Sequence, residues 1–183
     1  FVAELYTRWM ERFGNEISKA SFPQKEQSSQ FAPFEDDAVF LSYASEDRKA
    51  VLNLKTAMED NGIPVWFDQR CLEAGDDYTA KILENIEKCS LFIPVISRHT
   101  NTDQKRCFFR LEWRKALEEA KFRPDSVPFI LPVVIDDTPQ DALYVLNEFK
   151  KKHWQWFEGG HPTPEFINIV KNRIRQLRRE KRG

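Results

Sequence analysis

The chain has 183 residues, of which 41% are hydrophobic and 13% aromatic, so it can form one domain with a proper core and an additional segment. Its 28 Lys and Arg residues balance 29 Asp and Glu residues, which gives no general argument for binding nucleic acid or an acidic membrane surface. The three cysteines are far apart and odd in number, so they predict neither a disulfide framework nor a paired-cysteine metal site, and they favour a reducing cytosol.

Neither end of the chain nor its apolar runs indicate a membrane segment. The longest apolar run, VPFILPVVI (127–135), is too short to cross a bilayer and contains two prolines. No signal peptide is visible. Because the chain begins at Phe1 and not at Met, we expect a piece cut from a longer protein.

The first 36 residues predict a helix followed by a linker. Residues 20–36 are polar and broken by prolines, as is typical of a linker, so residues 37–183 are expected to form the main domain. The helix, predicted over residues 1–19, either packs on that domain or is the tail of an upstream domain. Its apolar residues recur every four positions, as in a helical stripe: Phe1, Leu5, Trp9 and Phe13.

After the linker, short apolar segments alternate with amphipathic helical ones. This alternation predicts the α/β class, with a parallel sheet covered by helices on both faces. We expect the flavodoxin-like arrangement of five strands in the order 2-1-3-4-5. The strands are predicted at residues 38–43, 63–68, 91–97, 128–135 and 153–157. Helices are predicted at residues 46–62, at 78–89, around residues 108–120 and after residue 164, with an irregular stretch at 137–150.

Each predicted helix carries an apolar stripe that should face the sheet. The stripes are Val51, Leu54 and Met58; Ile82, Ile86 and Cys89; Phe109, Trp113, Ala116 and Ala120; and Phe166, Val170, Ile174 and Leu177. In the third predicted strand, Pro94 lacks the N–H group that a central strand needs, so we expect a bulge or a locally one-sided strand there. Trp154 and Trp156 alternate as strand residues do, and at least one should be core.

One acidic residue, Glu112, stands out by its predicted position. In an open parallel sheet, ligands bind beyond the carboxyl ends of the strands where the strand order reverses, here between strands one and three. The segments SYASED (42–47) and 97–112 follow those strands, and Glu112 lies early in the next helix. Helical spacing places it beside Phe108, at the border between core and solvent. From spacing alone, Glu112 is either a solvated helix residue or a partly shielded catalytic carboxylate.

Several segments, in order, resemble those of Toll/interleukin-1 receptor (TIR) domains. VFLSYASEDR (39–48) resembles the first signature of that family. Residues 62–97 resemble its second strand, the BB loop, the second helix and the third strand. FFRLEWRKALEEA (108–120) resembles its third helix, and HWQW (153–156) its late strand. The resemblance covers roughly residues 37–177 and implies a TIR domain.

The family includes enzymes that cleave NAD+ at the nicotinamide–ribose bond and adaptors that act by association through the BB loop. In the enzymes an essential glutamate lies in the third helix, and the match places it at Glu112. The resemblance implies an NAD+ nucleosidase that is switched on by self-association through the BB loop (69–78) and acts as an immune or antiphage effector. An upstream sensor domain is a further expected partner. The alternative is a non-enzymatic TIR scaffold.

The same resemblance implies a pocket for NAD+, which is the substrate, and no cofactor. The residues that would line it come from the loop after the first strand, the BB loop and the third helix: Tyr43, Ala44, Ser45, Leu72, Gly75, Tyr78 and Phe108. The chain departs from the animal enzyme of the family, which has arginines after the strand-one tyrosine and Trp at the position of Phe108. Phosphate contacts and stacking are the features that these departures affect.

Other functional classes fit the sequence less well. A response regulator needs an Asp at the end of strand three, where this chain has Ser97. A dinucleotide-binding dehydrogenase would show a GxGxxG motif after a strand, and the sequence has none. The histidines have no metal-ligand spacing. The basic end of the chain (171–183) predicts a solvated helix terminus rather than an RNA-binding surface.

Overall fold

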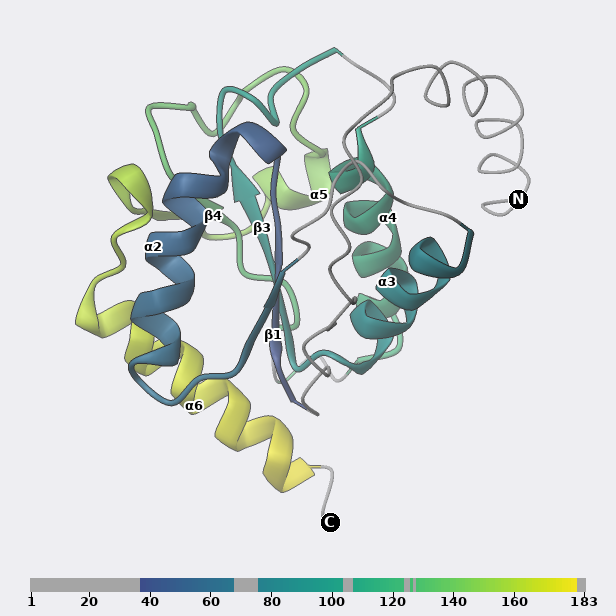
Figure 1. The fold of residues 1–183 in the computed structure, drawn as a ribbon, viewed down its shortest axis with the longest axis vertical. Helices are drawn as coiled ribbons and strands as arrows, with labels where there is room; N and C mark the ends of the chain where they lie inside the picture. Colours follow the sequence, from purple (N-terminus) through teal and green to yellow (C-terminus); the bar gives the residue numbers. More distant parts are fainter. Residues whose placement is uncertain (1–36, 68–75, 104–106, 124–125, 127, 181–183) are drawn as a thin grey trace, which may run out of the picture. The chain divides into compact units, whose positions relative to one another are not determined.

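The computed structural model describes residues 37–67, 76–103, 107–123, 126 and 128–180 (Figure 1). The helix predicted over residues 1–19 and the linker at 20–36 lie outside the described residues, so both stay predictions. The same holds for most of the BB loop.

The described part of the domain is a parallel sheet of five strands in the order β2-β1-β3-β4-β5, which confirms the flavodoxin-like α/β fold. The strands are β1 (Val39–Ser42), β2 (Val65–Phe67), β3 (Leu91–Ile96), β4 (Val133–Val134) and β5 (Gln155–Trp156). The helical elements are η1 (Ser45–Asp47), α2 (Arg48–Glu59), α3 (Asp76–Lys88), α4 (Phe108–Ala120), α5 (Asn147–Lys150), η2 (Glu158–Gly160) and α6 (Pro164–Glu180). The strands are shorter than predicted, and α5 lies in a stretch predicted to be irregular.

Helices cover both faces of the sheet (Figure 1). The core therefore consists of two clusters, one on each face. We call the face under α2 and α6 the α2 face, and the face under α3 and α4 the α4 face. Side chains of β1 alternate between them, so Val39 and Leu41 join the α2-face cluster while Phe40 joins the α4-face cluster. Ser42, the next residue of even number, therefore turns toward α4.

The helical stripes predicted from the sequence are confirmed. The residues of these stripes that are buried are Val51, Leu54, Met58, Ile82, Ile86, Cys89, Phe109, Trp113, Ala116, Phe166, Val170, Ile174 and Leu177. Ala120 is half-buried. Trp154 is core, whereas Trp156 is exposed. Among the described helices, none has the length and apolar composition needed to cross a membrane.

Pro94 makes β3 locally one-sided, as predicted. The Phe92 N–H donates to the Phe129 carbonyl, so the next residue that faces this neighbour is Pro94, which has no N–H. Pairing with β4 begins only at Val95, although pairing with β1 continues through Pro94 opposite Ser42. An isolated bridge joins Phe92 to Ile130. The register is the same on either side of Pro94, so the strand has no bulge.

Candidate active site

Glu112 is buried at the carboxyl end of β1. It lies in the second turn of α4, next to Trp113, which packs against the α4 face of the sheet. Its side chain is 4% exposed, and its carboxylate oxygen Oε2 accepts a hydrogen bond from the Ser42 hydroxyl. Glu112 is thus more deeply placed than the border position predicted from helical spacing, and it is not a solvated helix residue.

Of the residues expected to line the pocket, Ala44 and Phe108 share the face of the sheet with Glu112. Ala44 is buried in the α4-face cluster, and Phe108 is half-buried against the same cluster. Tyr43 points to the other face, where its ring centroid lies 5.8 Å from that of Phe67. Ser45 is exposed, and its hydroxyl donates to Glu46 Oε2 at 3.0 Å.

The BB-loop residues of the predicted pocket are Leu72, Gly75 and Tyr78. Leu72 and Gly75 lie outside the described residues. Tyr78 lies in the first turn of α3, and its side chain is outside the described part. The roles expected for these three residues stay predictions.

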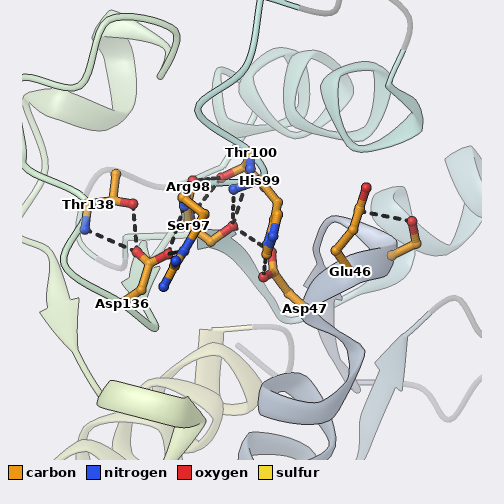
Figure 2. Close-up of polar contacts among 9 residues, drawn as sticks. Glu46, Asp47, Ser97, Arg98, His99, Thr100, Asp136 and Thr138 are labelled. Atoms are coloured by element: carbon orange, nitrogen blue, oxygen red, sulfur yellow. Dashed lines mark hydrogen bonds and ion pairs between the residues drawn. The ribbon is translucent and has the colours of Figure 1, made fainter.

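A second polar cluster lies at the same edge of the sheet (Figure 2). The Ser97 hydroxyl donates to Asp47 Oδ2 at 2.5 Å, and His99 Nδ1 lies 2.7 Å from Asp47 Oδ1. Ser97 Oγ also accepts the backbone N–H groups of His99 and Thr100. Burial raises the pKa of Asp47, although the hydrogen bonds from Ser97 and His99 act in the opposite direction. The cluster ties the loop after β3 to the start of α2.

This second cluster is on the α2 face. Ile93 and Val95 of β3 belong to the α2-face cluster, so Ser97, two residues further on, turns the same way. Asp47 directly precedes α2, which lies over that face (Figure 1). The two buried carboxylates, Glu112 and Asp47, therefore lie on opposite faces of the sheet.

Asp136, which follows β4, fixes a third loop (Figure 2). Its Oδ2 accepts the Arg98 backbone N–H at 2.8 Å and Arg98 Nε at 3.4 Å. Its Oδ1 accepts the Thr138 backbone N–H at 3.0 Å and the Thr138 hydroxyl at 2.6 Å. Burial alone would raise the pKa of Asp136, but the hydrogen bonds from Arg98 and Thr138 outweigh it, so the pKa is lowered.

Ser42, Asp47 and Asp136 were not predicted to be site residues. Each lies at or within a few residues of the end of a predicted strand, which is a signal that could have drawn attention to them. Their partners are Glu112, Ser97 and Arg98, which lie 70, 50 and 38 positions away along the chain. Such pairs follow only from the strand order. Within the described residues, no group of three or more His, Cys, Asp or Glu side chains could hold a metal ion.

The chain is similar to known proteins over part of its length. Two curated relatives are the probable 2′ cyclic ADP-D-ribose synthases TcpB of Brucella abortus (strain 2308) and Brucella melitensis biotype 1. Each is 33% identical over 75 residues, which is 40% of this chain and 27% of the relative. The chain thus matches about a quarter of the length of these relatives.

A solved structure with a similar fold is a metazoan TIR-STING receptor from C. gigas, in complex with 2′,3′-cGAMP. Its TM-score is 0.54 at 16% identity, and the match covers 79% of this chain and 41% of the receptor. At that identity the likeness concerns the fold alone. The sequence profile of the TIR domain matches residues 39–166, which is well over half of the chain. The chain therefore belongs to the TIR domain family.

Proposed function

We propose that this TIR domain cleaves NAD+ at the nicotinamide–ribose bond and that Glu112 is the catalytic residue. The observation that carries the proposal is the buried carboxylate of Glu112 at the carboxyl edge of the sheet, where ligands bind in this fold class, on the face that it shares with Ala44 and Phe108. The relatives named as probable cyclic ADP-ribose synthases support the same chemistry, because a cyclic ADP-ribose can be made from NAD+ once nicotinamide has left.

The reaction can proceed with a single carboxylate. In NAD+ the nicotinamide is a pyridinium, so it takes the electron pair of the broken C–N bond and departs neutral without a general acid. Ordinary glycosidases need a second acid because their leaving oxygen must be protonated. The carboxylate of Glu112 would stabilise the positive charge that develops on the ribose and hold the sugar hydroxyls.

Burial makes this stabilisation strong. Around a side chain that is 4% exposed, little water competes for the carboxylate, so its attraction to a cationic ribose is stronger than in bulk solvent. Attack of water on the ribose carbon then gives ADP-ribose and releases a proton. Attack by an adenine nitrogen or by another nucleophile gives a cyclic or conjugated product, and the proposal includes these outcomes.

Nicotinamide release from NAD+ by the purified protein at high concentration tests the proposal. Glu112→Gln keeps the size of the side chain and removes its charge, so we expect a loss on the order of a hundredfold or more. Glu119→Gln, two turns later on α4 and held by Lys115 at 2.8 Å, is the control and should be nearly silent. An inactive wild-type protein would favour the scaffold alternative, and retained turnover in a folded Glu112→Gln protein would reject Glu112.

We further propose that cleavage depends on self-association through the BB loop (69–78), as the family resemblance implies, with an upstream sensor as the trigger of an immune or antiphage response. The loop sequence QRCLEAGDDY is long, acidic and interrupted by Gly75, so it can change shape. If the BB loop of one copy contacts a different surface of the next copy, the contact is head-to-tail and forms open filaments. Assembly would then shift the population toward the conformation that can cleave NAD+.

A dilution series tests this dependence on assembly. Activity per molecule should rise with protein concentration, and Gly75→Pro should lower it by fixing the backbone without unfolding the domain. Constant specific activity, together with sedimentation of a monomer at every concentration, would instead indicate an autonomous enzyme.

A further inference from the structure

We propose that Ser42 is a positioning residue for Glu112: its hydroxyl holds the carboxylate in the orientation that meets the ribose. The inference rests on the proposed function of Glu112 and adds a residue to it. The contact that carries it is the hydrogen bond from Ser42 Oγ to Glu112 Oε2.

The hydrogen bond joins two fixed elements. Ser42 is the last residue of β1, which is paired with β2 on one side and with β3 on the other, and Ser42 itself lies opposite Pro94. Glu112 lies on α4 beside Trp113, whose ring centroid is 5.0 Å from that of Phe109 and 5.1 Å from that of Phe149. A group supported by rigid elements keeps its geometry better than one on a loop.

The bond restricts a flexible side chain. A glutamate reaches its carboxylate through three rotatable bonds, and a donor on one oxygen selects a few of the many orientations that they allow. Ser42 is 1% exposed and Glu112 is 4% exposed, so little water competes for either group. A hydrogen bond from a hydroxyl to a carboxylate is stronger than one between neutral groups, so it holds the carboxylate of Glu112 firmly.

A control contact lies at the opposite edge of the sheet, where β1 and β3 begin. Ser90 is also 1% exposed, and its hydroxyl donates to a carboxylate, Asp37 Oδ1, at 3.3 Å. Asp37 directly precedes Ala38 and β1, whereas Ser42 ends β1. Replacing Ser90 by Ala therefore removes a part-buried hydroxyl–carboxylate contact at the opposite edge of the sheet from Glu112.

The test is a kinetic comparison of Ser42→Ala, Ser42→Thr and Ser90→Ala in NAD+ cleavage. We expect Ser42→Ala to lower kcat about tenfold with little change in KM, because the lost hydrogen bond orients the catalytic group. Ser42→Thr keeps a hydroxyl and should recover most of this loss, and Ser90→Ala should keep the wild-type kcat. In a Glu112→Gln background, Ser42→Ala should have no further effect, since the two residues act as a unit.

The other outcomes overturn either the proposed function or the role of Ser42. Wild-type protein that releases no nicotinamide overturns the proposed function and this inference with it. An active wild type with Ser42→Ala within about twofold of its kcat overturns the role of Ser42 alone. An equal loss in Ser90→Ala, or a further tenfold loss in the Glu112→Gln background, would mean that Ser42 acts through general stability, and this too overturns the inference.

Discussion

Two buried carboxylates lie at the same edge of the sheet, and their surroundings differ. Asp47 precedes α2 on the α2 face, and its two oxygens contact Ser97 and His99 of the loop after β3. Glu112 lies within α4 on the other face, and it accepts a hydrogen bond from Ser42 at the end of a central strand. Burial and position at the carboxyl edge are therefore common to both residues, and they do not by themselves identify a catalytic group.

The partners of each carboxylate indicate its role. Asp47 connects two loops, so its contacts serve to hold the edge of the sheet together. Glu112 contacts a strand residue from α4, a helix that also packs on the sheet through Phe109 and Trp113. The face of the sheet also differs, since Ala44 and Phe108 lie on the Glu112 side. We infer that the α4 face carries the chemistry and the α2 face supports the loops.

The largest expected effect is on NAD+ cleavage, and it should differ between variants of the two carboxylates. Glu112→Gln should lower NAD+ cleavage on the order of a hundredfold or more, while Asp47→Asn should stay within roughly threefold of the wild type. Asn keeps the size of Asp47 and one acceptor oxygen. Nicotinamide release at saturating NAD+, measured with circular dichroism of each variant, provides the comparison. Similar losses of activity in both variants would contradict the distinction between a catalytic α4 face and a supporting α2 face.

A smaller effect concerns stability at the loop edge. Asp136→Asn should lower the free energy of unfolding by about 1–2 kcal/mol at neutral pH, because it weakens charge-assisted bonds from Arg98 and Thr138. The pKa of Asp136 is lowered on folding, so its charge stabilises the domain at pH values above its ordinary pKa of 3.8. This stabilisation is lost as the pH falls through the lowered pKa of the folded protein. In urea unfolding, the difference in unfolding free energy between variant and wild type should become smaller at acidic pH. A gap that is independent of pH would disagree with this account.

Stacking beside Glu112 gives a further test of the α4 face. Phe108→Ala should reduce NAD+ cleavage about tenfold by removing an aromatic surface for a base or ribose, whereas Phe108→Trp should preserve or improve it. Steady-state kinetics of both variants measure the effect. Phe122, which is 84% exposed just beyond the same helix, supplies the control substitution Phe122→Ala. Wild-type kinetics in Phe108→Ala would mean that Phe108 only packs.

The smallest expected effect is the pH dependence that Asp47 contributes. Burial raises its pKa above the ordinary value of 3.8, so the folded protein holds the proton more tightly than the unfolded chain. The contribution of Asp47 to stability must then fall as the pH rises from about 3.8 through the folded pKa. Asp47→Asn does not titrate, so its unfolding free energy should lack this fall. If the unfolding free energies of variant and wild type changed with pH in parallel, Asp47 would not have a raised pKa in the folded protein.

Much of the fold follows from local patterns in the sequence. Short apolar strands and helical stripes such as that of Phe166, Val170 and Ile174 predicted the elements, and the parallel sheet follows from their alternation. Pro94 predicted the one-sided strand because its missing N–H is a local property. The short helix α5 was not predicted, since a single turn carries too little periodicity to recognise.

The candidate site followed from the sequence only in part. Helical spacing and family resemblance pointed to Glu112, but its hydrogen bond to Ser42 spans 70 positions and depends on how α4 packs over β1. The direction of Tyr43 was available from the sequence, because it continues the alternation of Val39 and Leu41 away from α4. The Asp47–Ser97 pair depends on the adjacency of β1 and β3, which no local pattern encodes.

Beyond the interruption at Pro94, the β4 and β5 side of the sheet is held by fewer residue pairs than the β1 side. Four residue pairs join β1 to β3, whereas two join β3 to β4 and two join β4 to β5. Backbone amides held by few neighbouring bonds exchange their hydrogens with solvent earlier, so those of Phe157 and Ile135 should exchange before those of β1. Partial unfolding from the β5 side then leaves β1, with Ser42 at its end, paired on both sides.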